Sequence, residues 1–290
     1  MKSKYVAYTL IVLVCCATVS YATLCFSNSE VAKTIAENLK HNIGDFLWGT
    51  IGILLTFVST LLLFFTFNTQ QKQFKYTQKD AFRTRFEGTF FNMLSMYYKV
   101  RSEADKQIAQ YSKYSSKSLS DFYVEFKEYY KLALLKSPDF AGAMNQLAKD
   151  NILETQYKTA IFDLGELYDQ YIKHQGCNAG FYFRYVHNLV SFVLNHWQED
   201  NKDIHMYLNF IQAQMSDEEL ALVFYDSISN KGQDKNHKYT FKQNLDDHSF
   251  LENISESTLV NRNHYKIFPK TVFRFLNDDE KKHVMQYRRL

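Results

Sequence analysis

The stretch SEVAKTIAENLKHNIGD, residues 29–45, is a short polar segment between two long apolar runs near the start of the chain. Residues 5–26 carry no charged side chain, and neither do residues 46–67. Each run is long enough for a helix to cross about 30 Å of hydrocarbon, which takes roughly 20 residues. Only a helix crosses lipid as a single segment with its backbone polar groups satisfied. The sequence therefore predicts a transmembrane hairpin in residues 1–70, with spans at about 5–26 and 46–67 and a polar connector at 27–45.

The basic residues that flank the two runs predict the orientation of this hairpin. Lys2 and Lys4 precede the first run, whereas the connector carries three acidic and two basic residues. A cluster of basic residues follows the second run: Lys72, Lys75, Lys79, Arg83 and Arg85. Because Lys and Arg are retained on the cytoplasmic side, we expect both termini inside the cell and the connector outside. This is the topology of a two-span, multi-pass membrane protein.

A cleaved signal peptide is the alternative interpretation of the first run, because two lysines precede it. Its apolar stretch is longer than the about 7–15 residues of a typical signal-peptide core. We therefore expect an uncleaved anchor.

The second run carries a stripe of small residues on one predicted helix face: Gly49, Gly52, Thr56 and Thr60. Such a stripe lets another helix approach closely within lipid. Packing against the first span and self-association with other copies both remain open. Neither run contains an ionisable residue, so a transporter or proton relay is not indicated.

The rest of the chain, residues 71–290, has the pattern of a cytoplasmic helical domain. Apolar and aromatic residues recur at helical spacing, and the whole chain contains only nine Gly and two Pro. Pro138 predicts a break, and Ser216 with Glu219 forms a capping box that predicts a helix start at Asp217. The 21 Tyr and 25 Phe are expected to pack the core. The fold class is therefore all-α, with weaker patterns over the last fifty residues.

The predicted helix at residues 180–197 carries the best candidate for a functional surface, a polar stripe of Arg184, His187, Asn188, Ser191 and Asn195. Ribonucleases of the HEPN type also pair an Arg with a His on one helix, but four to six residues separate the two. Here only two residues intervene, which favours a polar seam against a neighbouring helix.

No other chemical motif is evident in the sequence. The four cysteines give neither a disulfide framework nor a metal-binding spacing, and the histidines lack zinc-site spacing. Phosphate-binding and dinucleotide-binding glycine motifs are missing as well. The formal net charge of +3 is small, so direct nucleic-acid binding is not expected. We predict no enzymatic site, no cofactor and no metal.

Three stretches resemble a known family: RFEGTFFNMLSMYYKVR (85–101), GFYFRYVHNLVSFV (180–193) and MSDEELALVFYDSIS (215–229). Following a two-span N-terminus, they resemble the phage abortive infection (AbiC-like) family of bacterial membrane proteins, over roughly residues 5–230. Two-span proteins of this type also resemble the membrane effectors encoded beside retron reverse transcriptases. The resemblance implies anti-phage defence that ends in host death or growth arrest. It supplies no catalytic residue.

Three hypotheses follow for the function. The first is an effector that disrupts the membrane without an enzymatic step, held inactive by a reverse transcriptase carrying its RNA–DNA product and activated by release or clustering. The second is a membrane-tethered HEPN-like ribonuclease that uses Arg184 and His187. The third is a harmless membrane anchor that recruits a toxic partner.

Overall fold

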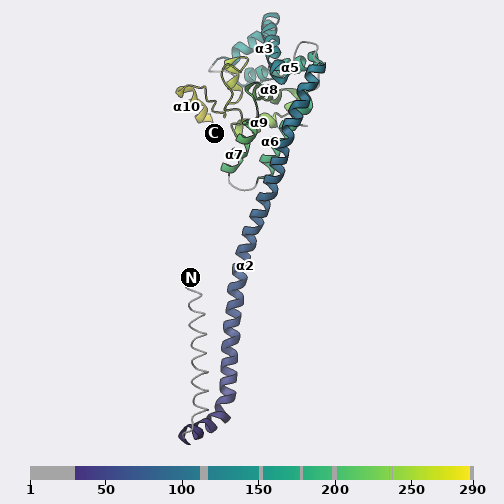
Figure 1. Cartoon of the computed structure of the whole chain (residues 1–290). Coiled ribbons are helices and arrows are strands. Elements are labelled where there is room, and N and C mark those ends of the chain that lie inside the picture. The colour runs from purple at the N-terminus through teal and green to yellow at the C-terminus, as the bar shows by residue number, and fades with distance from the viewer. Residues whose placement is uncertain are drawn as a thin grey trace. The chain divides into compact units, whose positions relative to one another are not determined.

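The computed structural model describes residues 30–111, 117–149, 153–176, 179–197, 201–234, 236 and 238–287. The chain divides into two compact units, Met1–Ala81 and Phe82–Leu290, and each is described by itself. In the described part every regular element is helical, which confirms the all-α class (Figure 1). The elements are α2 (Glu30–Tyr111), α3 (Leu119–Lys136), α4 (Pro138–Leu147), α5 (Glu154–Gln175), α6 (Gly180–His196), α7 (Asn201–Gln212), α8 (Asp217–Ser227), the short 3₁₀-helix η1 (Asn230–Gly232), α9 (Thr240–Asp247), the 3₁₀-helix η2 (Arg262–Ile267) and α10 (Asp278–Tyr287).

In the first unit, the described residues belong to α2, which begins at Glu30 and contains the whole of the predicted second span. The predicted first span, residues 5–26, lies outside the described residues, so the hairpin stays a prediction. The predicted connector differs from a simple turn, because it is helical from Glu30 onward. Its sequence accounts for this: Ala, Glu, Leu and Lys are strong helix formers, and residues 30–43 contain neither Gly nor Pro.

In the second unit, α2 continues from Phe82 and packs with one face into an aromatic core. Phe86, Phe90 and Tyr97 are buried, as their spacing of four and seven residues along a helix predicts. The ring of Phe86 lies 4.8 Å from Trp197 and 4.9 Å from Tyr207, measured between ring centroids. Aromatic pairs at such distances are stabilising in edge-to-face geometry. The start of this unit is thus fixed to α6 and α7 by ring packing.

The predicted core role of the aromatic residues is confirmed. The helices α3, α4, α5 and α8 contact one another around a common core. Among the described residues, the largest fully buried side chains are all Tyr or Phe: Tyr97, Tyr123, Tyr130, Tyr168, Tyr171, Tyr182, Tyr207, Tyr225, Phe90, Phe122, Phe126 and Phe224.

The helix ends follow local sequence signals. Ser137 caps α4 by accepting a hydrogen bond from Phe140 N at 3.3 Å, and Pro138 occupies the first helical position, where its missing N–H costs nothing. Gly176 ends α5 in the left-handed conformation, with φ of 70°. At the start of α8, Ser216 and Glu219 form the predicted capping box. The predicted break at Pro138 and the predicted helix start at Asp217 are therefore confirmed.

Between residues 241 and 287 the helices are short, and side chains hold much of the irregular backbone in place. Asp246, which is buried, accepts hydrogen bonds from Thr271 N, Thr271 Oγ1 and Lys270 N, each at 2.9 Å. Tyr157 of α5 donates to the carbonyl of Ile267 at 2.9 Å. Side-chain hydrogen bonds of this kind satisfy buried backbone groups without a helix or sheet. The weak periodicity of this region follows from that arrangement.

Candidate functional site

The first unit exposes a continuous apolar surface on α2. Ten large side chains are between 40% and 72% exposed: Ile53, Leu54, Leu55, Phe57, Leu61, Leu62, Leu63, Phe64, Phe65 and Phe67. Burying a side chain of this size stabilises by about 1.5–3 kcal/mol, so leaving all of them in water is strongly unfavourable. Among the described residues, α2 from Ile51 to Tyr111 is the one helix that is long and apolar enough to cross a membrane.

The threonines of this segment have no free hydroxyl donor. Thr56 donates to the carbonyl of Gly52 and Thr60 donates to the carbonyl of Thr56, both at 2.7 Å. In lipid such bonds to the preceding helical turn satisfy the hydroxyl groups. Gly52, Thr56 and Thr60 line one recess together with Ile53 and Phe57. The predicted small face is thus continuous over these three positions.

Gly49, the first member of the predicted stripe, lies one turn earlier in α2. The use of this face for helix packing stays a prediction.

In the second unit, the predicted polar stripe lies on the surface of α6. Arg184, His187, Asn188 and Asn195 are exposed, and Ser191 is half-buried. The His187 ring packs against Phe241 of α9, with 4.4 Å between ring centroids. Partial burial lowers the pKa of His187, because desolvation disfavours the charged imidazolium. The role of the stripe stays a prediction.

A buried carboxylate ties α8 to two other helices, a role that the sequence did not reveal. The Glu219 side chain is 0% exposed, and its Oε1 atom accepts hydrogen bonds from Tyr97 at 2.9 Å and Tyr182 at 3.1 Å. Arg101 Nε lies 3.0 Å from the same oxygen, and Oε2 accepts from Ser216 N at 2.8 Å. A buried charge is tolerated only when it is paired and hydrogen-bonded, as here.

Burial also raises the pKa of the Tyr97 and Tyr182 hydroxyls, so both remain protonated donors at neutral pH. The available sequence signal was the spacing of Tyr97 and Arg101, four residues apart on one face of α2. Only the capping role of Glu219 was predicted. The network joins α2, α6 and α8 into one body, and its polar groups satisfy one another, which is the arrangement of a structural link.

A second buried carboxylate, Asp226, lies near the end of α8 and is 7% exposed. Its Oδ1 atom is buried and has no hydrogen-bond partner among the described residues. Burial raises the pKa of Asp226 to about 7, with Lys231 acting in the opposite direction. Nearby, the buried Asp169 of α5 accepts a hydrogen bond from Asn230 N at 2.9 Å. A buried carboxylate without a partner destabilises the folded state when it is ionised. Ionisation of Asp226 should therefore weaken the junction between α5 and α8.

The same junction requires glycine. A Cβ atom on Gly165 would lie 2.2 Å from the carbonyl oxygen of Ile228, and one on Gly232 would lie 2.2 Å from the carbonyl oxygen of Ser227. These contacts are with backbone atoms, which cannot move away as the end of a flexible side chain can. A side chain larger than that of glycine would therefore not fit at either position. α5 and α8 are therefore in backbone-to-backbone contact beside the buried carboxylates.

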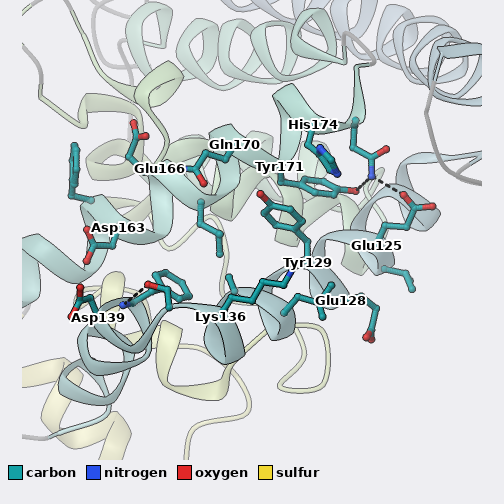
Figure 2. A pocket seen from close by; sticks show the side chains of 18 residues that line it. Glu125, Glu128, Tyr129, Lys136, Asp139, Asp163, Glu166, Gln170, Tyr171 and His174 are labelled. Carbon is teal, nitrogen blue, oxygen red and sulfur yellow. Dashed lines mark hydrogen bonds between the residues drawn. The ribbon is translucent and has the colours of Figure 1, made fainter.

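The second unit has a groove of about 880 Å³ between α3 and α5, closed at one end by the start of α4 (Figure 2). Residues from Val124 to Lys136 line the α3 wall, and residues from Phe162 to Gln175 line the α5 wall. Three of its apolar side chains stay exposed by half or more, namely Val124 at 55%, Leu132 at 50% and Phe162 at 52%.

The groove is acidic. Lys136 and His174 are outnumbered by carboxylates: Glu125, Glu128, Asp139, Asp163 and Glu166. Figure 2 shows the carboxylates of Asp139 and Asp163 pointing toward one another at the α4 end. The pKa of Asp163 is raised, first by burial and second by the negative charge of Asp139. The α4 end of the groove therefore concentrates negative charge.

Sequence analysis missed this groove, because its carboxylates come from three helices. No short motif contains them. The cluster could have been recognised only by knowing that α3 and α5 face one another.

Comparison with known proteins gives a match for part of the second unit, residues 178–257. No curated protein and no solved structure gives a significant match to this chain. A family model matches residues 178–257, which include α6, α7, α8, η1 and α9 and therefore Glu219 and Asp226. That family is described as "Putative phage abortive infection protein", and the AbiC-like resemblance of this chain is thereby confirmed over the matched residues.

Proposed function

We infer that this protein acts in phage abortive infection, a form of antiviral defence, because the description of the matching family implies that role. We propose that this protein is a membrane effector of that defence and that it acts by perturbing the bacterial inner membrane. The observation that carries the proposal is the exposed apolar surface of α2 between Ile53 and Phe67. Lipid is the solvent in which such a helix is stable, because its backbone and its threonine hydroxyls are already satisfied.

In this proposal the chain crosses the membrane twice, with both termini in the cytoplasm and the second unit inside the cell. The basic residues after the second run support this orientation. Release or clustering lets several copies associate through the face formed by Gly52, Thr56 and Thr60. Since one hairpin lacks ionisable groups, damage to the membrane requires several copies. No catalytic step is needed.

The proposed inhibitor is a reverse transcriptase carrying its RNA–DNA product, in keeping with the resemblance to retron effectors. The membrane-tethered ribonuclease and the harmless anchor remain the competing explanations. They differ from the proposal in a measurable way, because neither requires loss of membrane potential as the first event.

The test is a membrane-potential dye read during induced expression in cells. The unmodified chain should depolarise the membrane before growth stops. A variant with Leu61→Lys and Phe64→Lys should leave the membrane polarised, because a Lys within a span costs insertion free energy, about 2.5–3.5 kcal/mol at the centre of the span and less toward its ends.

Tyr76→Lys is the matched control, since it places the same residue at an exposed aromatic position beyond the apolar run. It should depolarise like the unmodified chain. Growth arrest at unchanged membrane potential would contradict the proposal and favour one of the competing explanations.

A further inference from the structure

We propose that the acidic groove between α3 and α5 binds a basic amphipathic helix of a partner protein. The proposal goes beyond membrane action and does not rest on it. It concerns described residues of the second unit alone, and its argument uses the length, the charge and the apolar floor of the groove.

The length of the groove fits a short helix. Its α3 wall runs from Val124 to Lys136 and its α5 wall from Phe162 to Gln175. At 1.5 Å per residue these walls are about 18–20 Å long, which equals about 12–13 residues of an occupying helix. A volume of about 880 Å³ leaves room for one row of side chains rather than for a folded domain.

The charge of the groove selects a basic occupant. Five carboxylates line it against Lys136 and His174, although the whole chain has a net charge of +3. A nucleic acid or an anionic lipid headgroup would be repelled by this surface. Lys or Arg side chains are attracted to it, and such complementarity governs partner choice and association rate.

Two of the carboxylates have no partner among the residues that the structure describes, which distinguishes them from the others. Glu125 accepts a hydrogen bond from Gln175 at 2.7 Å, and Glu128 pairs with Lys131 at 2.7 Å. Within the described residues, Asp139 and Asp163 have no cation or hydrogen-bond donor at their carboxylates. The pKa of Asp163 is raised, first by burial and second by repulsion from the negative charge of Asp139. A cation placed between them removes that repulsion. The α4 end is therefore where a Lys or Arg of the partner binds.

The apolar side chains of the groove account for the other face of the partner. Val124 and Leu132 are eight residues apart on α3, so they lie on one helix face, and Phe162 projects from the facing wall. All three are at least half exposed. An amphipathic helix covers such residues with its own apolar side while its basic residues contact the acidic rim, which is the usual helix-in-groove mode.

The test uses the full chain in nanodiscs of zwitterionic lipid and a fluorescein-labelled helical peptide of 14 Leu and Lys residues, the lysines on one face. After subtraction of binding to empty nanodiscs, fluorescence anisotropy should show saturable binding of this peptide and none of a matched peptide with Glu in place of every Lys. The double variant Asp139→Lys and Asp163→Lys should weaken binding by about 30-fold or more. Lys136→Glu should strengthen it by about 3-fold, a gain that misfolding cannot mimic.

The control variant carries Glu103→Lys and Asp278→Lys, two exposed carboxylates outside the groove, and should bind the Lys peptide like the unmodified chain. Both variants are held in the same lipid, so background binding of the peptide to lipid should be equal in the two samples. A difference in peptide affinity between them therefore reports on the groove. Equal affinity in the groove variant and the control would overturn the proposal. A change in oligomeric state by mass photometry, with peptide affinity unchanged, would overturn it as well and assign the groove to contacts between copies.

Discussion

Two regions of α2 present apolar side chains in opposite ways. Between Ile53 and Phe67 the helix carries no charged side chain, and its ten Ile, Leu and Phe side chains are each at least 40% exposed. From Phe86 to Ile108 one apolar face is buried, and the rest of the helix carries the charged residues together with the exposed Phe91, Met96 and Tyr98. A helix that is apolar all round is stable in lipid or deep in a core, whereas a one-sided helix packs on a protein body. The pattern around the helix, rather than its total hydrophobicity, thus shows which solvent each region needs.

The largest expected effect tests whether the second region is held by its buried network. Glu219→Ala should destabilise the second unit by about 3–5 kcal/mol, because it leaves Arg101 without its buried partner and two tyrosine hydroxyls without their acceptor. Thermal unfolding of the full chain in detergent, followed by tyrosine and tryptophan fluorescence, measures this loss.

Glu218→Ala, one residue away in the same first turn, is the control. It should cost less than about 1 kcal/mol, the usual helix-dipole contribution. Membrane attachment of the Glu219 variant should be unaffected. Equal stability of the two variants would mean that the buried network does not hold the unit together.

The next effect depends on pH. The pKa of Asp226 is raised from 3.8 to about 7, so between these values the folded state keeps a proton that the unfolded state has released. The contribution of Asp226 to stability is therefore fully present below about pH 4, falls as the pH rises to 7, and is lost above that. Asp226→Asn should remove this dependence, which amounts to about 2–4 kcal/mol across the range.

The measurement compares unfolding free energies of the Asp226 variant and the unmodified chain at several pH values between 4 and 8. Its readout is the difference in slope, which does not depend on how well Asn fits the site. Parallel curves would show that Asp226 ionises normally in the folded protein.

A smaller effect tests the contact between α5 and α8. Gly165→Ala places a methyl group against the carbonyl of Ile228 and should cost about 1–3 kcal/mol of folding stability. Gly142→Ala in α4 meets no atom within 4 Å and should be neutral or stabilise by up to about 1 kcal/mol. Chemical denaturation of both variants measures the difference. The close contact is refuted if the two substitutions have the same effect.

The smallest expected effect concerns the recess in the apolar region. Thr56→Leu fills the recess between Gly52 and Thr60, and it should reduce cross-linking between copies in the membrane by about 3-fold if copies pack there. Thr66→Leu removes the same type of hydroxyl bond, to Leu62, outside the recess, and should leave cross-linking unchanged. Equal cross-linking in both variants would indicate that another face is used.

The sequence predicted the fold well where all the residues that form a pattern lie within one helix or at its end. The aromatic spacing before Tyr97, the break at Pro138 and the capping box at Ser216 each depend on residues within one or two turns, and the structure has all three. The secondary structure of the connector was harder to predict. Its polar composition indicated a turn, but its helix propensity prevailed from Glu30 onward.

The candidate sites depend on distant residues, which explains why sequence alone did not reveal them. Glu219 meets Tyr97 across 122 positions of the chain, and the groove joins carboxylates from α3, α4 and α5. Neither arrangement has a local spacing that marks it. α7 was also missed, because it lies in a polar stretch whose buried residues, such as Tyr207 and Ile211, give only a short pattern.

The central claim is that the apolar region of α2 resides in lipid, and extraction of membranes with alkaline carbonate tests it most directly. A chain from which residues 5–26 are deleted should stay in the membrane pellet, because α2 alone holds it there, whereas the same deletion combined with Leu61→Lys and Phe64→Lys should move to the soluble fraction. Recovery of the chain with the deletion alone in the carbonate supernatant would contradict the account.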